Sequence, residues 1–424
     1  MNTFENNFLT FNLYKMQKLL FLIIVFVLTI NIVSNACTTA VVSGKYTKDG
    51  RPLLLKNRDT WAVNNSMKFF DAEPYSFLGL VNSKDSLAKS VWIGSNSAGF
   101  AIMNSASYNL NVDDTLKQSG LEGRIMKMAL QYCKTVDDFQ TMLDTIQKPY
   151  LLEANFGVID AEGGAAYFEL GNYKYTKIDA NDPAVAPNGY LIRTNFSFTG
   201  KMGIGGGYIR YQTASDLFYE AVSTNDLDAQ FIIQKVIRSL KHSLTGTDLS
   251  DYKNIAKNTP TYFHFRDYIP RTGSSSGVVV QGVKKNENPE FTTIWAVVGF
   301  PLTSVVVPFW IKGGEQLPEI ASYDSEINDS PLCHAALQFK KDCLPVRFGI
   351  NGKYYININA LLNADNSGYM QVLAPVENEI FKRTKTQLEL WRNNEITKAG
   401  VQEFYSEIDA FIKKEYAEKL NYNF

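Results

Sequence analysis

The spacing of hydrophobic positions changes several times along this chain, and each spacing predicts a kind of element. Residues 38–42 and 52–55 are short apolar runs, rich in β-branched or aliphatic side chains, on either side of a turn-forming Lys-Asp-Gly-Arg segment at 48–51. This pattern is typical of a β-hairpin. Helical spacing of apolar residues recurs in three segments, at 121–146, 211–222 and 229–240. Strand-like runs follow at 278–281, 292–298 and 304–310, and residues 377–420 predict one or two amphipathic helices.

The order of these elements bears on fold class and domain organisation. Hairpins are followed by helices and then by more strands, which favours an α+β protein in which stacked sheets are covered by helices. Repeats and low-complexity linkers are absent from the sequence. We therefore expect one main domain over residues 37–330, with a C-terminal extension, 331–424, packed on it.

Composition excludes several classes of protein and of partner. The chain of 424 residues has 42 basic and 43 acidic residues, 20% charged and 45% hydrophobic overall, as in an ordinary globular protein. A net charge of -1 makes nucleic acid a poor partner. The three histidines, His242, His264 and His334, lack metal-ligand spacing, so we expect no metal site and no cofactor. The Gly/Ser-rich segment 272–277 lacks the lysine of a phosphate loop and is interpreted as a turn or a substrate-side loop.

The N-terminal segment resembles a secretory signal peptide. Lys15 and Lys18 precede an apolar run at 19–33, and Ser34-Asn35-Ala36 supplies the small residues found before a cleavage point. A retained membrane anchor is the alternative, but the run is shorter than the roughly 20 residues of a spanning helix. We therefore expect residues 1–36 to be removed and the protein to be exported, periplasmic or extracellular, with no membrane contact afterwards.

Cleavage after Ala36 would make Cys37 the first residue, which has two interpretations. One is a lipoprotein, in which the thiol carries a diacylglyceryl group and the amine is blocked. The other is an N-terminal nucleophile, whose free α-amine serves as the base for its own thiol. Ser34 stands where a lipidation site prefers a branched apolar residue, and a strand follows Cys37 at once instead of a flexible tether. These features favour the nucleophile.

Several motifs, taken in order, resemble the Ntn (N-terminal nucleophile) amide hydrolases. They are the Cys37-Thr38 start, the Lys-Asp-Gly turn, Asn57-x-Asp59, the segments 92–104 and 155–170, Thr194-Asn195, and the Tyr208–Tyr211 segment that begins a helix. The family includes penicillin V acylases, bile salt hydrolases and isopenicillin N acyltransferase-like proteins. The resemblance implies a four-layer αββα sandwich and cleavage of a linear C–N amide through a thioester.

The resemblance also implies roles for particular residues. Cys37 would be nucleophile and amine base, and Asp59 would orient the amine. Asn195 would donate to the oxyanion, and Asn104 would take the second polar position near the nucleophile. Arg210 would steady the nucleophile and nearby carboxylates. Without the resemblance, Asp59 and the two asparagines are equally typical of strand ends and turns, and Arg210 of a solvated helix start.

One position departs from the family pattern. The acylases carry arginine before the Asn-x-Asp element, whereas this chain has Lys56-Asn57-Arg58-Asp59. Lys56 keeps the charge without the planar guanidinium. Strand alternation places Lys56 and Arg58 on one face, so either could take the role, and bile salt activity is placed in doubt.

The sequence thus predicts an exported hydrolase acting on a small N-acyl amide, with acyl transfer to an amine as a variant. The alternatives are a Cys-Thr-type dipeptidase of the same superfamily and a non-catalytic lipoprotein. Self-association stays open. Among the remaining cysteines, Cys133 falls on a helical stripe and is expected to be a buried thiol. Cys333 and Cys343 could form a disulfide in an exporting compartment.

Overall fold

The computed structural model describes residues 36–118, 120–346, 348–349 and 351–424. The chain divides into two units, Met1–Asn35 and Ala36–Phe424, and the description that follows concerns the second. The predicted signal peptide lies outside the described residues, apart from Ala36. Among the helices of the described residues, none combines the length and apolar character needed to cross a bilayer.

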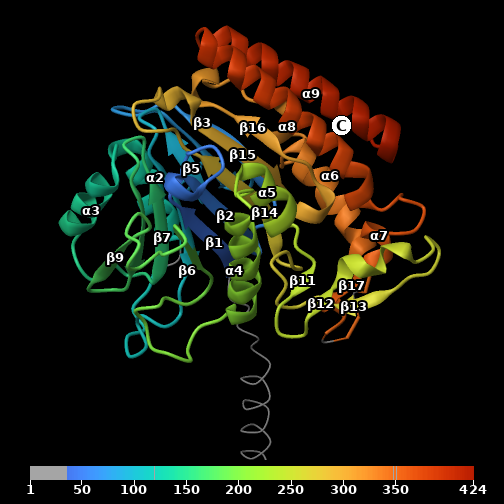
Figure 1. Cartoon of the computed structure of the whole chain (residues 1–424), viewed down its shortest axis with the longest axis horizontal. Coiled ribbons are helices and arrows are strands. Elements are labelled where there is room, and N and C mark those ends of the chain that lie inside the picture. The colour runs from blue at the N-terminus through green and yellow to red at the C-terminus, as the bar shows by residue number, and fades with distance from the viewer. Residues whose placement is uncertain (1–35, 119, 347, 350) are drawn as a thin grey trace, which may run out of the picture. The chain divides into compact units, whose positions relative to one another are not determined.

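A six-stranded antiparallel sheet forms the centre of the described unit (Figure 1). In spatial order its strands are β10 (Tyr190–Arg193), β1 (Ala36–Val42), β2 (Leu53–Asp59), β14 (Ser274–Gln281), β15 (Thr293–Val298) and β16 (Val307–Phe309). The predicted hairpin is confirmed, because β1 pairs with β2 from Ala36–Asp59 to Val42–Leu53. Every residue of β1, β2 and β15 is buried, so both faces of this sheet are covered.

A seven-stranded antiparallel sheet packs against the first. It is a meander in chain order, and two short two-stranded sheets lie outside it. The strands of the meander are β3 (Asn65–Phe70), β4 (Phe77–Asn82), β5 (Ile93–Asn96), β6 (Ala101–Ala106), β7 (Ala154–Ile159), β8 (Ala165–Leu170) and β9 (Tyr175–Asp179). The short sheets pair β11 (Lys241–His242) with β12 (Thr247–Asp248), and β13 (Tyr262–His264) with β17 (Tyr355–Asn357).

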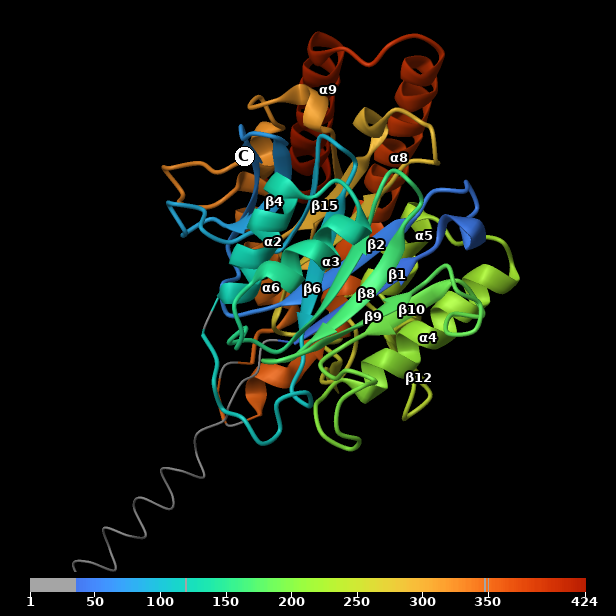
Figure 2. The same ribbon diagram turned by 90° about the vertical axis from the view of Figure 1, so that its left-hand side faces the viewer.

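Helices cover the outer face of each sheet (Figure 2). They are α2 (Leu121–Tyr132), α3 (Val136–Thr145), α4 (Tyr208–Ser223), α5 (Ala229–Phe231), α6 (Pro331–Cys343), α7 (Ile358–Leu361), α8 (Tyr369–Asn393) and α9 (Lys398–Leu420), and a π-helical segment, η2 (Ile232–Ile237), continues α5. The predicted single helix at 121–146 is wrong. The chain leaves the helix at Cys133, and Thr135 begins α3 with a capping box in which Asp138 takes part.

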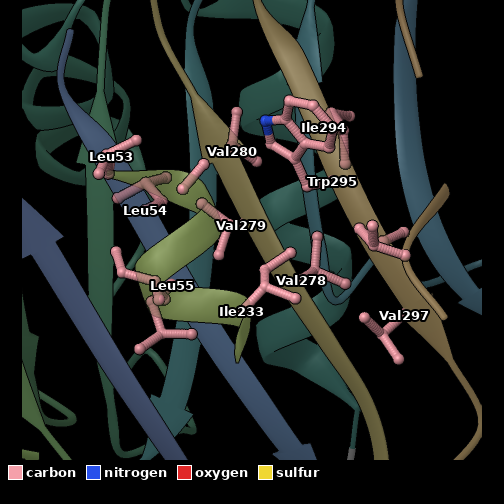
Figure 3. Packing of buried hydrophobic residues seen from close by; sticks show 14 of the residues in the cluster. Leu53, Leu54, Leu55, Ile233, Val278, Val279, Val280, Ile294, Trp295 and Val297 are labelled. Carbon is pink, nitrogen blue, oxygen red and sulfur yellow. The ribbon is translucent and has the colours of Figure 1, made fainter. Parts of the chain in front are cut away.

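The core is divided by the sheets. One apolar cluster lies between α2, α3 and the seven-stranded sheet. A larger cluster joins the facing sides of the two sheets and continues to α4, η2, α8 and α9. Its centre is a row of leucines, valines and a tryptophan across β2, β14 and β15 (Figure 3). The order helices, sheet, sheet, helices is the predicted α+β sandwich of four layers.

The remaining cysteines are free and buried. Cys133 is a buried thiol, as predicted, and burial raises its pKa to about 12. A disulfide between Cys333 and Cys343 is excluded, because both lie on α6, ten residues apart. A rise of 1.5 Å per residue separates them by about 15 Å, whereas a disulfide needs Cα atoms within about 7 Å.

Candidate active site

Cys37 is the second residue of β1, and strand alternation turns its side chain toward the seven-stranded sheet. It shares a face with Thr39, whose hydroxyl accepts a hydrogen bond of 2.9 Å from a tyrosine of β8. Cys37 is buried, with 7% of its surface exposed. Cys37 lies opposite Arg58, and Ala36 lies opposite Asp59. The Ala36–Cys37 peptide bond therefore lies beside the end of β2, and its cleavage would leave the new amine next to Asp59.

Asp59 is held by three hydrogen-bond donors. Arg271 Nε donates to Oδ2 at 2.7 Å, and Ser274 Oγ donates to Oδ1 at 2.5 Å. Asn57 Nδ2 adds a longer bond of 3.3 Å to Oδ1. Burial by itself lowers the pKa of Arg271, but the charge of Asp59 and the hydrogen bond to it outweigh burial, so the pKa is raised. The carboxylate is therefore fixed in place beside the start of β1.

Sequence reasoning missed Arg271 and Ser274 as site residues. Both lie more than 200 positions after Asp59, and a single sequence does not reveal that their turn returns to the end of β2. The one available signal was the Gly/Ser-rich composition of 272–277, which was interpreted as a turn or a substrate-side loop. That segment forms the turn before β14 and the start of the strand itself.

Arg210 approaches Cys37 from the opposite face of β1. It lies in the first turn of α4 and is buried, and its Nη1 donates to Cys37 O at 2.7 Å and to Thr38 Oγ1 at 3.0 Å. Its Nη2 donates to Asn195 Oδ1 at 2.7 Å. Burial and the charge of Arg271 lower the pKa of Arg210 to about 10. The guanidinium thus remains charged at neutral pH and ties the start of β1 to Asn195.

The glycine before α4 makes room for this arginine. Gly207 has φ of +84°, a conformation that L-residues avoid. A Cβ at this position would lie 2.3 Å from Arg210 Nη2 and 2.9 Å from Thr194 Cβ. Both the backbone conformation and the space therefore require glycine at position 207.

Asn195 follows β10, and its backbone forms an isolated bridge with Gly206. Its side-chain oxygen faces Arg210, and its Nδ2 donates to Ala106 O at 3.0 Å. The residue is buried, with 1% of its surface exposed. The structure therefore brings Asn195 to the same place as Arg210 and the start of β1.

Lys56 and Asn104 meet between the two sheets. Lys56 Nζ donates to Asn104 Oδ1 at 2.6 Å and to Asn104 O at 2.7 Å. Burial is the main reason that the pKa of Lys56 falls to about 8, whereas a negative charge on Cys37 acts in the opposite direction. Because lysine holds the amide oxygen of Asn104, its NH₂ group is the end that can donate elsewhere.

Arg58 lies on the same inner face as Lys56, as strand alternation predicted. Its Nη1 donates to Asn65 Oδ1 at 2.5 Å, its Nη2 donates to Asn82 Oδ1 at 2.8 Å, and its guanidinium carbon lies 4.6 Å from the ring centroid of Trp92. Burial lowers its pKa to about 10, and a negative charge on Cys37 opposes that effect. Lys56 and Arg58 donate to amide oxygens, so their charge is available to favour an anion near Cys37.

Comparison with known proteins gives remote likenesses. No protein-family model and no curated protein matches the chain. Among solved structures, a Caenorhabditis elegans orthologue of N-acylethanolamine-hydrolyzing acid amidase is 16% identical, with a TM-score of 0.37, over 48% of this chain and 86% of its own. Penicillin V acylase from Agrobacterium tumefaciens is also 16% identical, with a TM-score of 0.38, over 65% and 86%.

A variant of conjugated bile acid hydrolase from Clostridium perfringens is 11% identical, with a TM-score of 0.40, over 65% of this chain and 92% of its own. The motif resemblance named the penicillin V acylases and the bile salt hydrolases, and structures from both groups are among these. Because these identities and TM-scores are low, the description of the fold and of the candidate site rests on the strand order and the contacts of this chain.

Proposed function

We propose that this protein is an exported hydrolase that cleaves a linear C–N amide of a small N-acylated molecule, with Cys37 as nucleophile. The observation that carries the proposal is the position of the Ala36–Cys37 bond, which lies opposite Asp59 at the head of a buried strand. Removal of residues 1–36 would give one residue both a thiol and an amine at a place where a carboxylate, two amides and four cations lie close together.

The reaction needs no other base. The α-amine of Cys37 takes the thiol proton as sulfur attacks the amide carbonyl, and the C–N bond breaks as the amine returns the proton to the leaving nitrogen. A thioester remains on Cys37. Water then attacks this thioester, the α-amine takes the water proton, and the C–S bond breaks to release the acid and restore the thiol.

The surrounding residues have distinct roles in this scheme. Asp59, fixed by Arg271 and Ser274, orients the ammonium that forms during each step. Arg210 and Lys56 hold the oxygens of Asn195 and Asn104. In this scheme both amides donate to the oxyanion, and Asn195 Nδ2 also donates to Ala106 O. One such donor is worth about 3 to 4 kcal/mol in comparable sites.

Burial of Cys37 weighs against a lipid anchor. Ala36 and Cys37 are 3% and 7% exposed, and they are the first two residues of a strand that is paired from its start. A diacylglyceryl group on this sulfur would point between the two sheets, where Lys56 and Arg58 lie. We therefore do not propose lipidation.

For the substrate, we propose an apolar acyl group joined to a polar amine, on the basis of the motif resemblance. A panel of acyl amides that release chromogenic amines tests this part of the proposal. We expect Cys37→Ala to abolish hydrolysis and to leave the melting temperature nearly unchanged. Cys133→Ala, which removes a buried thiol outside the site, is the matched control and should retain activity. Turnover by Cys37→Ala would refute the mechanism.

A further inference from the structure

Helix α6 reaches the candidate site from the C-terminal part of the chain. The helix is held close to the loop after β15, because Thr303 Oγ1 donates to Ala336 O at 2.9 Å. At Gly299, φ is +81°, and a Cβ there would lie 2.6 Å from Ala336 Cβ. The position of α6 against the six-stranded sheet is therefore fixed by close backbone contact, and its side chains reach defined places.

Lys340, near the end of α6, binds the turn that holds Asp59. Its Nζ donates to Thr272 O at 2.7 Å and to Ser274 O at 3.4 Å. It also lies 4.7 Å from the ring centroid of Phe300. The residue keeps some exposed surface, but burial of its ammonium lowers its pKa to about 8, against the opposing charge of Asp59. Within the described part of the chain, this ammonium contacts backbone carbonyls and a ring but no carboxylate, which makes its charge costly to place there. We therefore expect Lys340 to have a function other than stability.

The turn that Lys340 binds makes three hydrogen bonds to Asp59 and the residue after it. Arg271 and Ser274 supply the side-chain bonds, and Gly273 O accepts from Thr60 N at 2.9 Å, directly after Asp59. The turn is closed internally, because Ser274 N donates to Arg271 O at 2.8 Å and Arg271 N donates to Ser274 Oγ at 2.9 Å. A shift of this turn would therefore move both side-chain donors together.

The other end of α6 supports the cation opposite Cys37. Ser330 Oγ, just before the helix, donates to Asn65 O at 2.7 Å, and Asn65 N donates to Cys333 Sγ at 3.4 Å. Asn65 in turn accepts from Arg58. Helix α6 and the residue before it thus contact the partners of both Arg58 and Asp59, the two residues that lie opposite the start of β1.

We propose that Lys340 is a positioning residue for the Asp59 carboxylate, acting from α6 through the 271–274 turn. The inference rests on the proposed function, because it gives Lys340 a role in the chemistry of Cys37 without contact to the substrate. Loss of the ammonium lets the turn move away from Asp59 and leaves the α-amine of Cys37 less well oriented.

The test is Lys340→Met in the processed enzyme, residues 37–424, with Lys341→Met as the matched control. Lys341 is the exposed neighbour on the same helix. We expect Lys340→Met to lower kcat between about 10- and 100-fold, as misplacement by an ångström can, with KM within twofold of wild type. Its melting temperature should not fall, because methionine fills the stem's volume without burying a charge. Lys341→Met should match wild type in all three.

A second variant shows whether Lys340 acts through the turn. Ser274→Ala removes one bond to Asp59 and should lower kcat by itself, whereas the double variant should lose less than the product of the two single losses. An unchanged kcat in Lys340→Met, a loss of melting temperature that parallels the loss of kcat, failure to fold, or multiplicative losses in the double variant would each overturn the proposal.

The outcome is separable from that of the proposed function. Wild-type enzyme without hydrolysis of any acyl amide, or Cys37→Ala with hydrolysis, refutes the function itself. The rate at which iodoacetamide alkylates Cys37 is measured on the same samples and needs no substrate. We expect this rate to fall in Lys340→Met and not in Lys341→Met, and equal rates in both variants contradict the positioning role.

Discussion

Replacement of Asp59 by asparagine tests the electrostatic centre of the site. The amide keeps the shape of the carboxylate, but only one of its two polar ends is an oxygen that can accept from the three donors. The other end, an NH₂ group, faces a donor and cannot accept from it. The larger effect is on Arg271, which loses the charge that raises its pKa. Removal of one partner from a buried ion pair costs about 3 to 5 kcal/mol. Because 21% of the Arg271 side chain is exposed, we expect the lower end, about 3 kcal/mol.

Urea unfolding of Asp59→Asn and wild type, monitored by tryptophan fluorescence, measures this free energy. Asp226→Asn is the control, because Asp226 and Lys48 form an ion pair whose side chains are 53% and 52% exposed, and its unfolding midpoint should stay nearly unchanged. Hydrolysis by Asp59→Asn should fall by at least 100-fold. A loss of stability below about 0.5 kcal/mol would show that the pair with Arg271 contributes little and would refute this reasoning.

Three other predictions concern single features of the fold. Gly207→Ala should destabilise by at least about 1 to 2 kcal/mol, the cost of a left-handed conformation, and should lower kcat by displacing Arg210; equal unfolding midpoints would contradict it. The pKa of Lys56 is lowered from 10.5 to about 8, so the unfolded state binds more protons than the folded state between these pH values. The stability of wild type relative to Lys56→Met should therefore rise with pH across that window. Urea midpoints of both proteins near pH 7.5 and 10 measure this difference, and a difference that stays constant would contradict a buried ammonium. Alkylation of the denatured, unreduced protein should modify both Cys333 and Cys343, and a pair of unmodified cysteines in the mass spectrum would disprove their free state.

Local patterns predicted the parts of the site that lie close together in sequence. The hairpin of β1 and β2 follows from two apolar runs and a turn, and its register brings Cys37 opposite Arg58. The shared face of Lys56 and Arg58 follows from alternation alone. The motif order predicted Asn195 and Arg210 as candidate site residues, and the structure brings the two into hydrogen-bonding contact.

Contacts between distant segments were not accessible in this way. The clamp on Asp59 comes from a turn more than 200 residues later, and Lys340 comes from a helix that the sequence assigned to an extension. The break at Cys133 within the predicted 121–146 helix depends on a cap at Thr135, which competes with apolar spacing that continues on both sides. In each case a tertiary or capping contact determined the structure, and the spacing of residues along the chain does not reveal such contacts.

Mass spectrometry of the exported, processed protein, quenched during turnover of an N-acyl amide, tests the central claim most directly. The account predicts a chain that begins at Cys37 and carries the acyl group on that residue as a hydroxylamine-labile thioester. A chain that retains residues before Cys37, a diacylglyceryl group on its sulfur, or turnover with the acyl group bound to another residue would contradict it.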